Sequence, residues 1–276
     1  MWSASNKCKM MDMDIEQIAS NFILKNTSFS GKTAIILGSG LGEYAEVLTD
    51  RKYLDYSEIP YYPIPNVEGH TGELVIGKVF GKEIIIANGR VHCYEGYDRK
   101  RVTFAVRVLK KCGVQNLIIT NSSGSLKIEN KPGTLMIIKG HMDCTFQNHY
   151  QNLKLIKGNN YHSKKLIKLS EKVAIENEIK VTFGNYCWVL GPSYETPEEI
   201  NYFKLYNGSA VGMSTLPEIE EAKEQGLDVL SLALLTNYAA GINKSILSHE
   251  EVIEVASKSK TKLIKILSGI IKGIKE

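Results

Sequence analysis

Short apolar runs alternate along this chain with longer segments that have the spacing of amphipathic helices. Every position of Leu117-Ile118-Ile119 is apolar, which is typical of a strand covered on both faces of a sheet. In residues 99–112 the apolar side chains instead recur at helical spacing. This alternation predicts an α/β fold of three layers, with helices packed against a central sheet.

The same periodicities place elements from residue 14 onward. The last helix opens at Ser248, and its many lysines favour a solvated face opposite an apolar core face over binding to a membrane surface. Neither an internal repeat nor a low-complexity linker is visible, so one domain is predicted over residues 14–276, and the Met-rich residues 1–13 are a candidate disordered N-terminus. Strands are expected near 33–37, 52–56, 73–79, 83–88, 116–120, 134–138, 181–190, 209–212 and 228–235, and helices near 14–25, 43–48, 99–112, 163–177, 197–206, 216–225 and from 248 onward.

Composition narrows the function classes. A net charge of +4, from 34 Lys and Arg against 30 Asp and Glu, is too balanced to indicate nucleic-acid binding. The five cysteines form no C-x-x-C pair, which indicates reduced thiols in the cytoplasm and neither a disulfide framework nor a zinc site. The histidines show no metal-binding spacing, so no metal is predicted. No signal peptide and no apolar run approaching about 18 residues is visible, so no membrane span is expected.

A polar cluster follows the apolar run 84–87. Residues 89–96 read Gly-Arg-Val-His-Cys-Tyr-Glu-Gly, and in an extended chain Arg90, His92 and Tyr94 point to the same side. An arginine fork and a histidine suit an oxyanion that lies next to a planar or sugar group. Taken alone, the cluster fits a surface strand end with a salt bridge equally well.

A glycine-rich turn follows the first expected strand. Residues 33–42 read Thr-Ala-Ile-Ile-Leu-Gly-Ser-Gly-Leu-Gly, and such glycines let backbone N–H groups approach an anion at a helix start. Glutamate at position 43 disfavours a dinucleotide fingerprint, and a Walker A loop is absent. The segment is therefore either a small anion loop carrying Ser39 or a tight strand-to-helix turn.

Three further segments place polar groups just after expected strands, where open α/β sheets bind small ligands. They are Gly-Pro-Ser-Tyr-Glu-Thr-Pro at 191–197, Ala-Val-Gly-Met-Ser-Thr-Leu-Pro-Glu at 210–218, and Thr236-Asn237. In isolation Tyr194 is more typical of a core residue, and Glu195 equally fits an acid at a helix start. Their position after strands favours a ligand site, but only the family resemblance described next favours a functional role for Tyr194 and Glu195.

With these motifs in this order, and with Gly-His-Thr-Gly at 69–72, the chain resembles the trimeric-type purine nucleoside phosphorylases from about Lys32 to the C-terminus. The combination is specific, although no single motif is. The resemblance implies a mixed, partly barrel-like central sheet flanked by helices. It also implies reversible phosphorolysis of inosine and guanosine, or their deoxy forms, to a free base and a pentose 1-phosphate in purine salvage. A homotrimer is expected, with orthophosphate as co-substrate and no cofactor.

The resemblance also assigns residues to three parts of a site, and it implies catalytic roles for His92, Glu195, Asn237 and His249. Glu95 is expected to pair with His92 and to tune its charge. Ser122 is expected to offer phosphate either its hydroxyl or only its backbone. The implied phosphate residues are Ser39, Arg90, His92, Ser122 and Ser214, the sugar residues His70, Tyr94, Met213 and His249, and the base residues Tyr194, Glu195, Val211, Gly212, Thr236 and Asn237.

Glu195 and Asn237 together favour a 6-oxopurine. The carboxylate accepts N1–H, while the amide donates to O6 and accepts from a proton arriving at N7. An aspartate at position 237 would instead suit a 6-aminopurine. His249, expected at the 5′-hydroxyl, also fits a plain role in the first turn of a helix, and His70 also fits a plain turn.

Some segments depart from the family pattern, and two alternatives stay open. The segments 121–125 and 140–143 differ from the usual motifs, and 144–165 is shorter and more polar than expected, so Tyr161 is only a candidate for the aromatic lent to a neighbouring subunit. Residues 123–126 resemble the methylthioadenosine phosphorylases, which Asn237 and His249 oppose. A non-catalytic nucleoside- or phosphate-binding module is opposed by the full set of phosphate residues.

Overall fold

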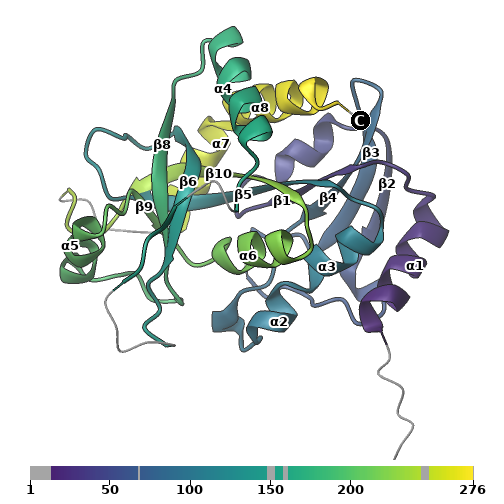
Figure 1. Cartoon of the computed structure of the whole chain (residues 1–276), viewed down its shortest axis with the longest axis horizontal. Coiled ribbons are helices and arrows are strands. Elements are labelled where there is room, and N and C mark those ends of the chain that lie inside the picture. Colours follow the sequence, from purple (N-terminus) through teal and green to yellow (C-terminus); the bar gives the residue numbers. More distant parts are fainter. Residues whose placement is uncertain (1–13, 68, 148–152, 158–160, 244–248, 276) are drawn as a thin grey trace, which may run out of the picture.

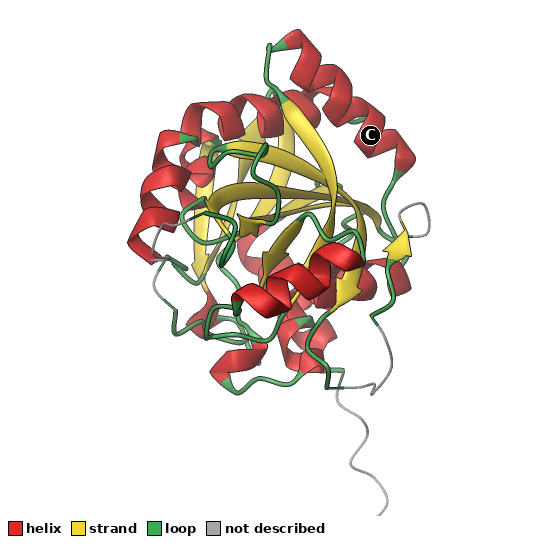
Figure 2. Cartoon of the chain, turned by 90° about the vertical axis from the view of Figure 1, so that its left-hand side faces the viewer, coloured by secondary structure: helices red, strands yellow, loops and turns green. Residues whose placement is uncertain are grey.

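The computed structural model describes residues 14–67, 69–147, 153–157, 161–243 and 249–275 (Figure 1). Its strands form one mixed sheet with helices on the outside (Figure 2). The strands are β1 (Thr33–Leu37), β2 (Thr49–Asp55), β3 (Glu73–Val79), β4 (Lys82–Asn88), β5 (Asn116–Ser125), β6 (Thr134–Asp143), β7 (Ile156–Lys157), β8 (Val181–Trp188), β9 (Ala210–Gly212) and β10 (Asp228–Tyr238).

Five of these strands close into a barrel. The order runs from β10 through β6, β8 and β9 to β5, and β5 pairs again with β10. The strands β1, β4, β3 and β2 then continue the sheet outward from β5. Parallel pairs such as β1 with β5 occur beside antiparallel pairs such as β5 with β9. The mixed, partly barrel-like sheet that the resemblance implied is therefore confirmed.

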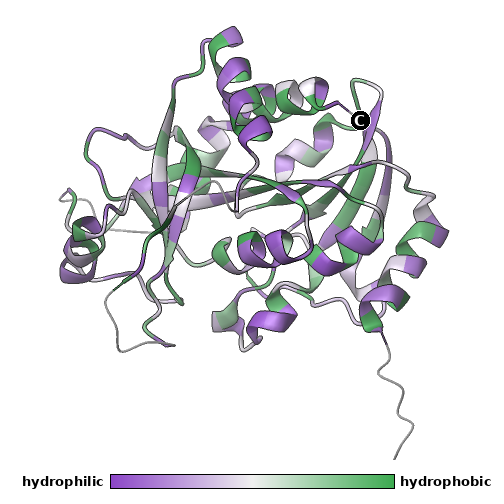
Figure 3. Ribbon diagram, in the orientation of Figure 1, coloured by the Kyte–Doolittle hydropathy of each residue, from purple (hydrophilic) through white to green (hydrophobic). Residues whose placement is uncertain are grey.

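The helices complete the outer layers. The α-helices are α1 (Ile15–Thr27), α2 (Arg99–Val102), α3 (Phe104–Lys111), α4 (Lys164–Glu176), α5 (Pro197–Leu205), α6 (Leu216–Glu224), α7 (His249–Lys258) and α8 (Lys260–Gly273), and the 3₁₀ helices are η2 (Gly42–Val47), η3 (Tyr56–Glu58) and η4 (Cys93–Glu95). The helices carry both hydrophilic and hydrophobic residues, whereas the central strands are largely hydrophobic (Figure 3). Helices such as α3 and α8 thus bury apolar residues against the sheet and expose polar ones.

Two apolar cores lie on opposite faces of the sheet. Ile35 and Leu37 of β1 belong to the core that α4, α7 and α8 cover, whereas Ala34 and Ile36 belong to the core under α1, α3 and α6. Successive strand residues point to opposite faces, so a strand covered on both sides must be apolar throughout. Each fully buried aliphatic side chain contributes about 1.5–3 kcal/mol of transfer free energy. The three predicted layers are confirmed.

Several predicted boundaries were wrong. The predicted helix 99–112 is two helices that meet at Thr103, and the predicted last helix is α7 and α8, which meet at Ser259. Residues 42–47 form a 3₁₀ helix instead of an α-helix. At Thr103 and Ser259 the backbone departs from helical dihedral angles, with ψ near 5° and −2°, while the apolar pattern continues. Periodicity alone therefore carries no sign of these breaks.

Strands β5 and β10 run further than their apolar residues do. The polar residues 121–125 continue β5 because their backbone groups pair with both β10 and β9 where the barrel closes. The pairing register of β10 shifts between Leu235 and Asn237, as in a β-bulge. A bulge re-aims the side chains beside it, which lets the neighbours Thr236 and Asn237 both line the same cavity. Every helix within the described residues is too short or too polar to span a bilayer.

Candidate active site

A cavity of about 360 Å³ lies where β1, β4, β5, β8 and β10 reach their carboxyl-terminal halves. Ligands of open α/β sheets bind at such strand ends. Fourteen side chains or backbones expected from the sequence line this one cavity, although they come from segments far apart in the chain. They are Ser39, His70, Arg90, His92, Tyr94, Ser122, Tyr194, Glu195, Val211, Gly212, Met213, Ser214, Thr236 and Asn237.

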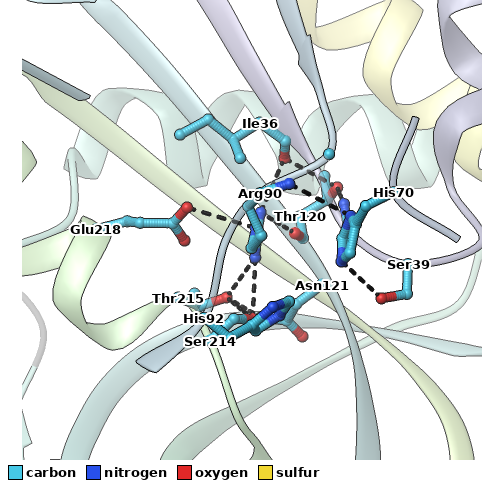
Figure 4. A network of polar contacts seen from close by, with 12 residues as sticks. Ile36, Ser39, His70, Arg90, His92, Thr120, Asn121, Ser214, Thr215 and Glu218 are labelled. Atoms are coloured by element: carbon cyan, nitrogen blue, oxygen red, sulfur yellow. Dashed lines mark hydrogen bonds and ion pairs between the residues drawn. The ribbon is translucent and has the colours of Figure 1, made fainter. Parts of the chain in front are cut away.

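Arg90 lies buried at one side of the cavity and is held by the protein through all three guanidinium nitrogens (Figure 4). Nη1 donates to the hydroxyls of Ser214 (3.0 Å) and Thr215 (3.1 Å), and Nη2 donates to the carbonyls of Thr120 (2.7 Å) and Ile36 (3.4 Å). Nε lies 3.4 Å from a carboxylate oxygen of Glu218. The alternative of a solvated surface salt bridge is therefore wrong, because the side chain of Arg90 is only 4% exposed.

His70 connects Arg90 to the glycine-rich turn. Its Nδ1 accepts from the backbone N–H of Arg90 (3.3 Å), and its Nε2 lies 2.9 Å from the hydroxyl oxygen of Ser39. An imidazole whose Nδ1 accepts carries its proton on Nε2, so His70 donates to Ser39. The hydroxyl proton of Ser39 remains available for an acceptor in the cavity. A side chain at Gly38 is excluded because its Cβ would come within 2.7 Å of the Asn121 backbone.

The predicted pair of His92 and Glu95 is present. Nδ1 of His92 lies 2.9 Å from the Glu95 carboxylate, which also accepts from the backbone N–H groups of His92 and Asn66. Burial alone would raise the pKa of Glu95, but these hydrogen bonds outweigh it and leave the pKa below its ordinary value. The ionised carboxylate makes Nδ1 the donor and leaves Nε2 as the ring's other polar atom.

The rings of His70, His92 and Tyr94 stand in a row along the cavity. The ring of His92 stacks on Tyr94 with centroids 4.7 Å apart, and its centroid lies 5.2 Å from that of His70. Burial and the nearby Glu95 carboxylate raise the pKa of Tyr94 to about 12, so its phenol stays a neutral hydrogen-bonding group.

The cavity lining also includes one acid, Glu195, and one amide, Asn237. Burial raises the pKa of Glu195, and Tyr194 beside it is 42% exposed, so the tyrosine is not a core residue. The Oδ1 of Asn237 accepts from the Thr236 hydroxyl (3.0 Å), and its Nδ2 donates to the carbonyl of Tyr238 (3.0 Å). An acid whose pKa is raised by burial is typical of functional sites. The side chains of Met213 and Val211 line the same cavity.

Ser122 and a set of unpredicted residues also reach the cavity. The hydroxyl of Ser122 donates to the carbonyl of Ser39 (2.8 Å), so its one proton is engaged within the protein. The unpredicted lining residues share no composition signal, except that three of them, Asn121, Ser123 and Gly124, belong to the polar stretch after the apolar run of β5. They are Gly38, Val67, Asn121, Ser123, Gly124, Pro192 and Val252.

Two expected residues are not placed in the cavity. The backbone of His249 begins α7, but its side chain lies outside the part of the structure that is described. The ring of Tyr161 packs edge-on against His141 of the same chain, with centroids 4.8 Å apart, so its role toward a neighbouring subunit stays a prediction. Within the described ranges, no group of three or more His, Cys, Asp or Glu side chains is arranged to hold a metal ion.

Comparisons with known proteins show which family and fold the chain resembles. A profile of the phosphorylase superfamily matches residues 32–272. Purine nucleoside phosphorylase 1 of Bacillus subtilis (strain 168) is 40% identical over 265 residues, covering 92% of this chain and 96% of that protein. The structure of Schistosoma mansoni purine nucleoside phosphorylase in complex with inosine has a TM-score of 0.86 and 29% identity, covering 96% of this chain and 98% of that chain. The complex with adenosine has a TM-score of 0.85 and 31% identity, covering 95% and 97%.

Proposed function

The chain belongs to the purine nucleoside phosphorylases of the phosphorylase superfamily, and from this premise we propose how its cavity carries out the reversible phosphorolysis of purine nucleosides. One observation carries the assignment. Donors suited to an oxyanion, namely Ser39, Ser214 and the Arg90 network, share one cavity with Glu195 and Asn237, which suit a purine edge. A nucleoside that spans the cavity places its C1′ between the two sets.

The reaction needs little covalent chemistry from the protein. An oxygen of orthophosphate attacks C1′ while the C1′–N9 bond breaks, and the bond electrons leave with the purine, which takes up a proton at N7. The transition state carries a positive ribosyl group between a phosphate and a departing base that are both negative. Positioning the partners and stabilising these charges supplies the rate enhancement.

The phosphate half supplies hydroxyl donors backed by a buried cation. Ser39 accepts from His70 and donates into the cavity, and the ring of His92 offers Nε2 beside it. The cation of Arg90 lies behind Ser214 and strengthens that donor. We propose that phosphate binds here, with the row His70, His92 and Tyr94 along the path toward the ribose.

The base half favours a 6-oxopurine. The carboxylate of Glu195 accepts N1–H of hypoxanthine or guanine, and Asn237 exchanges its present backbone partner for O6 and the proton at N7. Adenine carries no hydrogen on N1 and places an amino group at position 6, so it loses the first bond. The S. mansoni enzyme has been crystallised with adenosine as well as inosine, so binding alone does not reveal substrate preference. Substrate preference must therefore be measured by cleavage.

The two alternatives left by the sequence are not supported. The relatives at 40% and 38% identity are named purine nucleoside phosphorylases, which argues against both a methylthioadenosine phosphorylase and a binding module without catalysis. We further propose that the protein is a cytoplasmic homotrimer. Free cysteines at positions 93, 112, 144 and 187 support a reducing compartment.

Release of hypoxanthine from inosine, followed with and without orthophosphate, tests the proposed function. We expect cleavage only with phosphate present and much slower cleavage of adenosine under the same conditions. Cleavage at the same rate in phosphate-free buffer would identify a hydrolase and refute the assignment of the phosphate half. Faster cleavage of adenosine or methylthioadenosine would refute the assignment of the base half.

A further inference from the structure

Glu218 is a buried carboxylate that the reaction itself does not require. It lies in the first turn of α6, is 2% exposed, and does not line the cavity. Its Oε1 lies 3.4 Å from Nε of Arg90, while its Oε2 has no hydrogen-bond partner within the described residues. A buried carboxylate is costly unless it is paired, and in the described part of the chain the ionic partner of Glu218 is Arg90.

The guanidinium that Glu218 holds is joined to a strained turn. Thr215 has φ 76° and ψ −47°, a conformation that β-branched residues avoid. Its hydroxyl oxygen accepts from Nη1 of Arg90 (3.1 Å) and from Nδ2 of Asn121 (2.8 Å). These two bonds occupy both lone pairs, so the hydroxyl proton of Thr215 must be donated, and the hydroxyl of Ser214 lies 3.1 Å away.

The same count fixes the direction of the Ser214 hydroxyl. Its oxygen accepts from Nη1 of Arg90 (3.0 Å) and from the hydroxyl of Thr215, which fills both of its lone pairs. Its single proton therefore has no acceptor among these neighbours and is donated into the cavity, which Ser214 lines. The backbone carbonyl of Ser214 is anchored separately by the hydroxyl of Tyr186 (2.9 Å).

We infer that Glu218 is a positioning residue for phosphate, which acts through Arg90 and Thr215 to make the Ser214 hydroxyl an obligatory donor toward the anion. This inference rests on the proposed phosphate half of the site. The carboxylate holds the guanidinium by charge rather than by a hydrogen bond, because Nε–H lacks hydrogen-bond geometry toward it. With the guanidinium released, Nη1 no longer orders the two hydroxyls, and Ser214 is free to turn its proton toward Thr215.

The alternative is that Glu218 only partly neutralises the positive charge of Arg90 and so weakens its attraction for phosphate. The two roles predict opposite results for Glu218→Gln, which keeps the shape of the side chain and removes its charge. If Glu218 positions Ser214, the variant binds phosphate about ten-fold more weakly, in line with the loss of one charge-assisted contact. If Glu218 only damps the charge, the guanidinium becomes more attractive and the variant binds phosphate more tightly.

Glu221 provides a matched control on the same helix. Its carboxylate also pairs with a partly buried arginine, lying 2.9 Å from Nη1 of Arg107, but it does not line the cavity or contact Arg90. Glu221→Gln therefore reproduces the loss of a helix α6 ion pair without touching the phosphate half. It is expected to leave the KM for phosphate and the KM for inosine within about two-fold of wild type.

The experiment is a double-mutant cycle on the full chain, made from Glu218→Gln and Ser214→Ala and read by the KM for phosphate, the KM for inosine and the calorimetric Kd of orthophosphate. The positioning role predicts that Glu218→Gln raises the phosphate constants about ten-fold and the inosine KM less than two-fold. It also predicts that the double variant is no worse than Ser214→Ala alone, because both changes remove the same donor.

An unchanged or lowered phosphate constant in Glu218→Gln, or effects that multiply in the double variant, would overturn the inference. Glu218→Asp keeps the charge but withdraws the carboxylate by one methylene, and it is expected to weaken phosphate as well. If Glu218→Gln is too unstable for kinetics, Glu218→Asp provides the same comparison. Failure of the proposed function is distinguishable, because wild type would then show no phosphate-dependent cleavage while the calorimetric cycle still tests Glu218.

Discussion

Replacing Glu195 by glutamine isolates the hydrogen bond that distinguishes a 6-oxopurine from other bases. The carboxylate is half-buried in the cavity wall, and burial raises its pKa. A hydrogen bond to a charged group contributes about 1.5–3 kcal/mol. The amide of glutamine keeps an acceptor oxygen, and the neighbouring Tyr194 is open to solvent, so the lower half of that range applies. We therefore expect kcat/KM for inosine to fall about 10- to 40-fold.

The pH profile separates this role from a loss of stability. Only the ionised carboxylate accepts N1–H, so kcat/KM for inosine should fall as the pH drops through the pKa of Glu195. Because that pKa is raised, the fall should begin at a higher pH than for an exposed glutamate. In Glu195→Gln this acidic limb should disappear, since the amide does not titrate.

The assay is steady-state kinetics with inosine between about pH 4.5 and about pH 8, and Tm is measured to follow stability. Glu198→Gln is the matched control, because Glu198 is exposed in the first turn of α5 and does not line the cavity. A Glu195→Gln variant with wild-type kcat/KM, or one that keeps the acidic limb, would refute the assignment of Glu195 to the base.

Three further predictions address other parts of the account. Arg90→Ala should raise the phosphate KM about ten- to a hundredfold. It should also lower the free energy of unfolding by about 3–5 kcal/mol, because Glu218 is left buried without its partner. An unchanged phosphate KM would remove Arg90 from the site. Asn237→Asp should shift the ratio of kcat/KM values from inosine toward adenosine, because a carboxylate repels O6 and accepts from the 6-amino group; an unchanged ratio would exclude Asn237 from base selection. Light scattering should give about three chain masses, and a fully active monomer would contradict the proposed trimer.

The sheet was predictable where burial dictates composition. Residues Ile35 to Leu37 and Leu117 to Ile119 lie between two helical layers, and only an apolar run satisfies both faces. The closing of the barrel left no such mark. It depends on the polar second half of β5 pairing with β9 and β10, where backbone hydrogen bonds rather than side-chain burial decide the structure.

The cavity residues were predicted as a set because the resemblance assigned them to one site. Most of them also follow strands along the chain, and strand ends meet at one edge of a sheet. Apart from the pair of His92 and Glu95, their contacts were not predicted. Nothing in the spacing of Arg90, Thr215 and Glu218 indicates that the guanidinium faces protein oxygens on every side. The β-bulge that brings Thr236 and Asn237 to the same cavity is likewise a tertiary feature, since neighbours in a regular strand point to opposite faces.

The identity of the pentose product tests the central claim most directly. Wild-type protein is incubated with inosine and orthophosphate, and the products are followed by phosphorus NMR and by release of hypoxanthine. We predict one ribose 1-phosphate formed for each hypoxanthine released, with neither product formed when phosphate is omitted. Free ribose in place of ribose 1-phosphate would show that water is the nucleophile. The residues assigned to phosphate would then have no catalytic role.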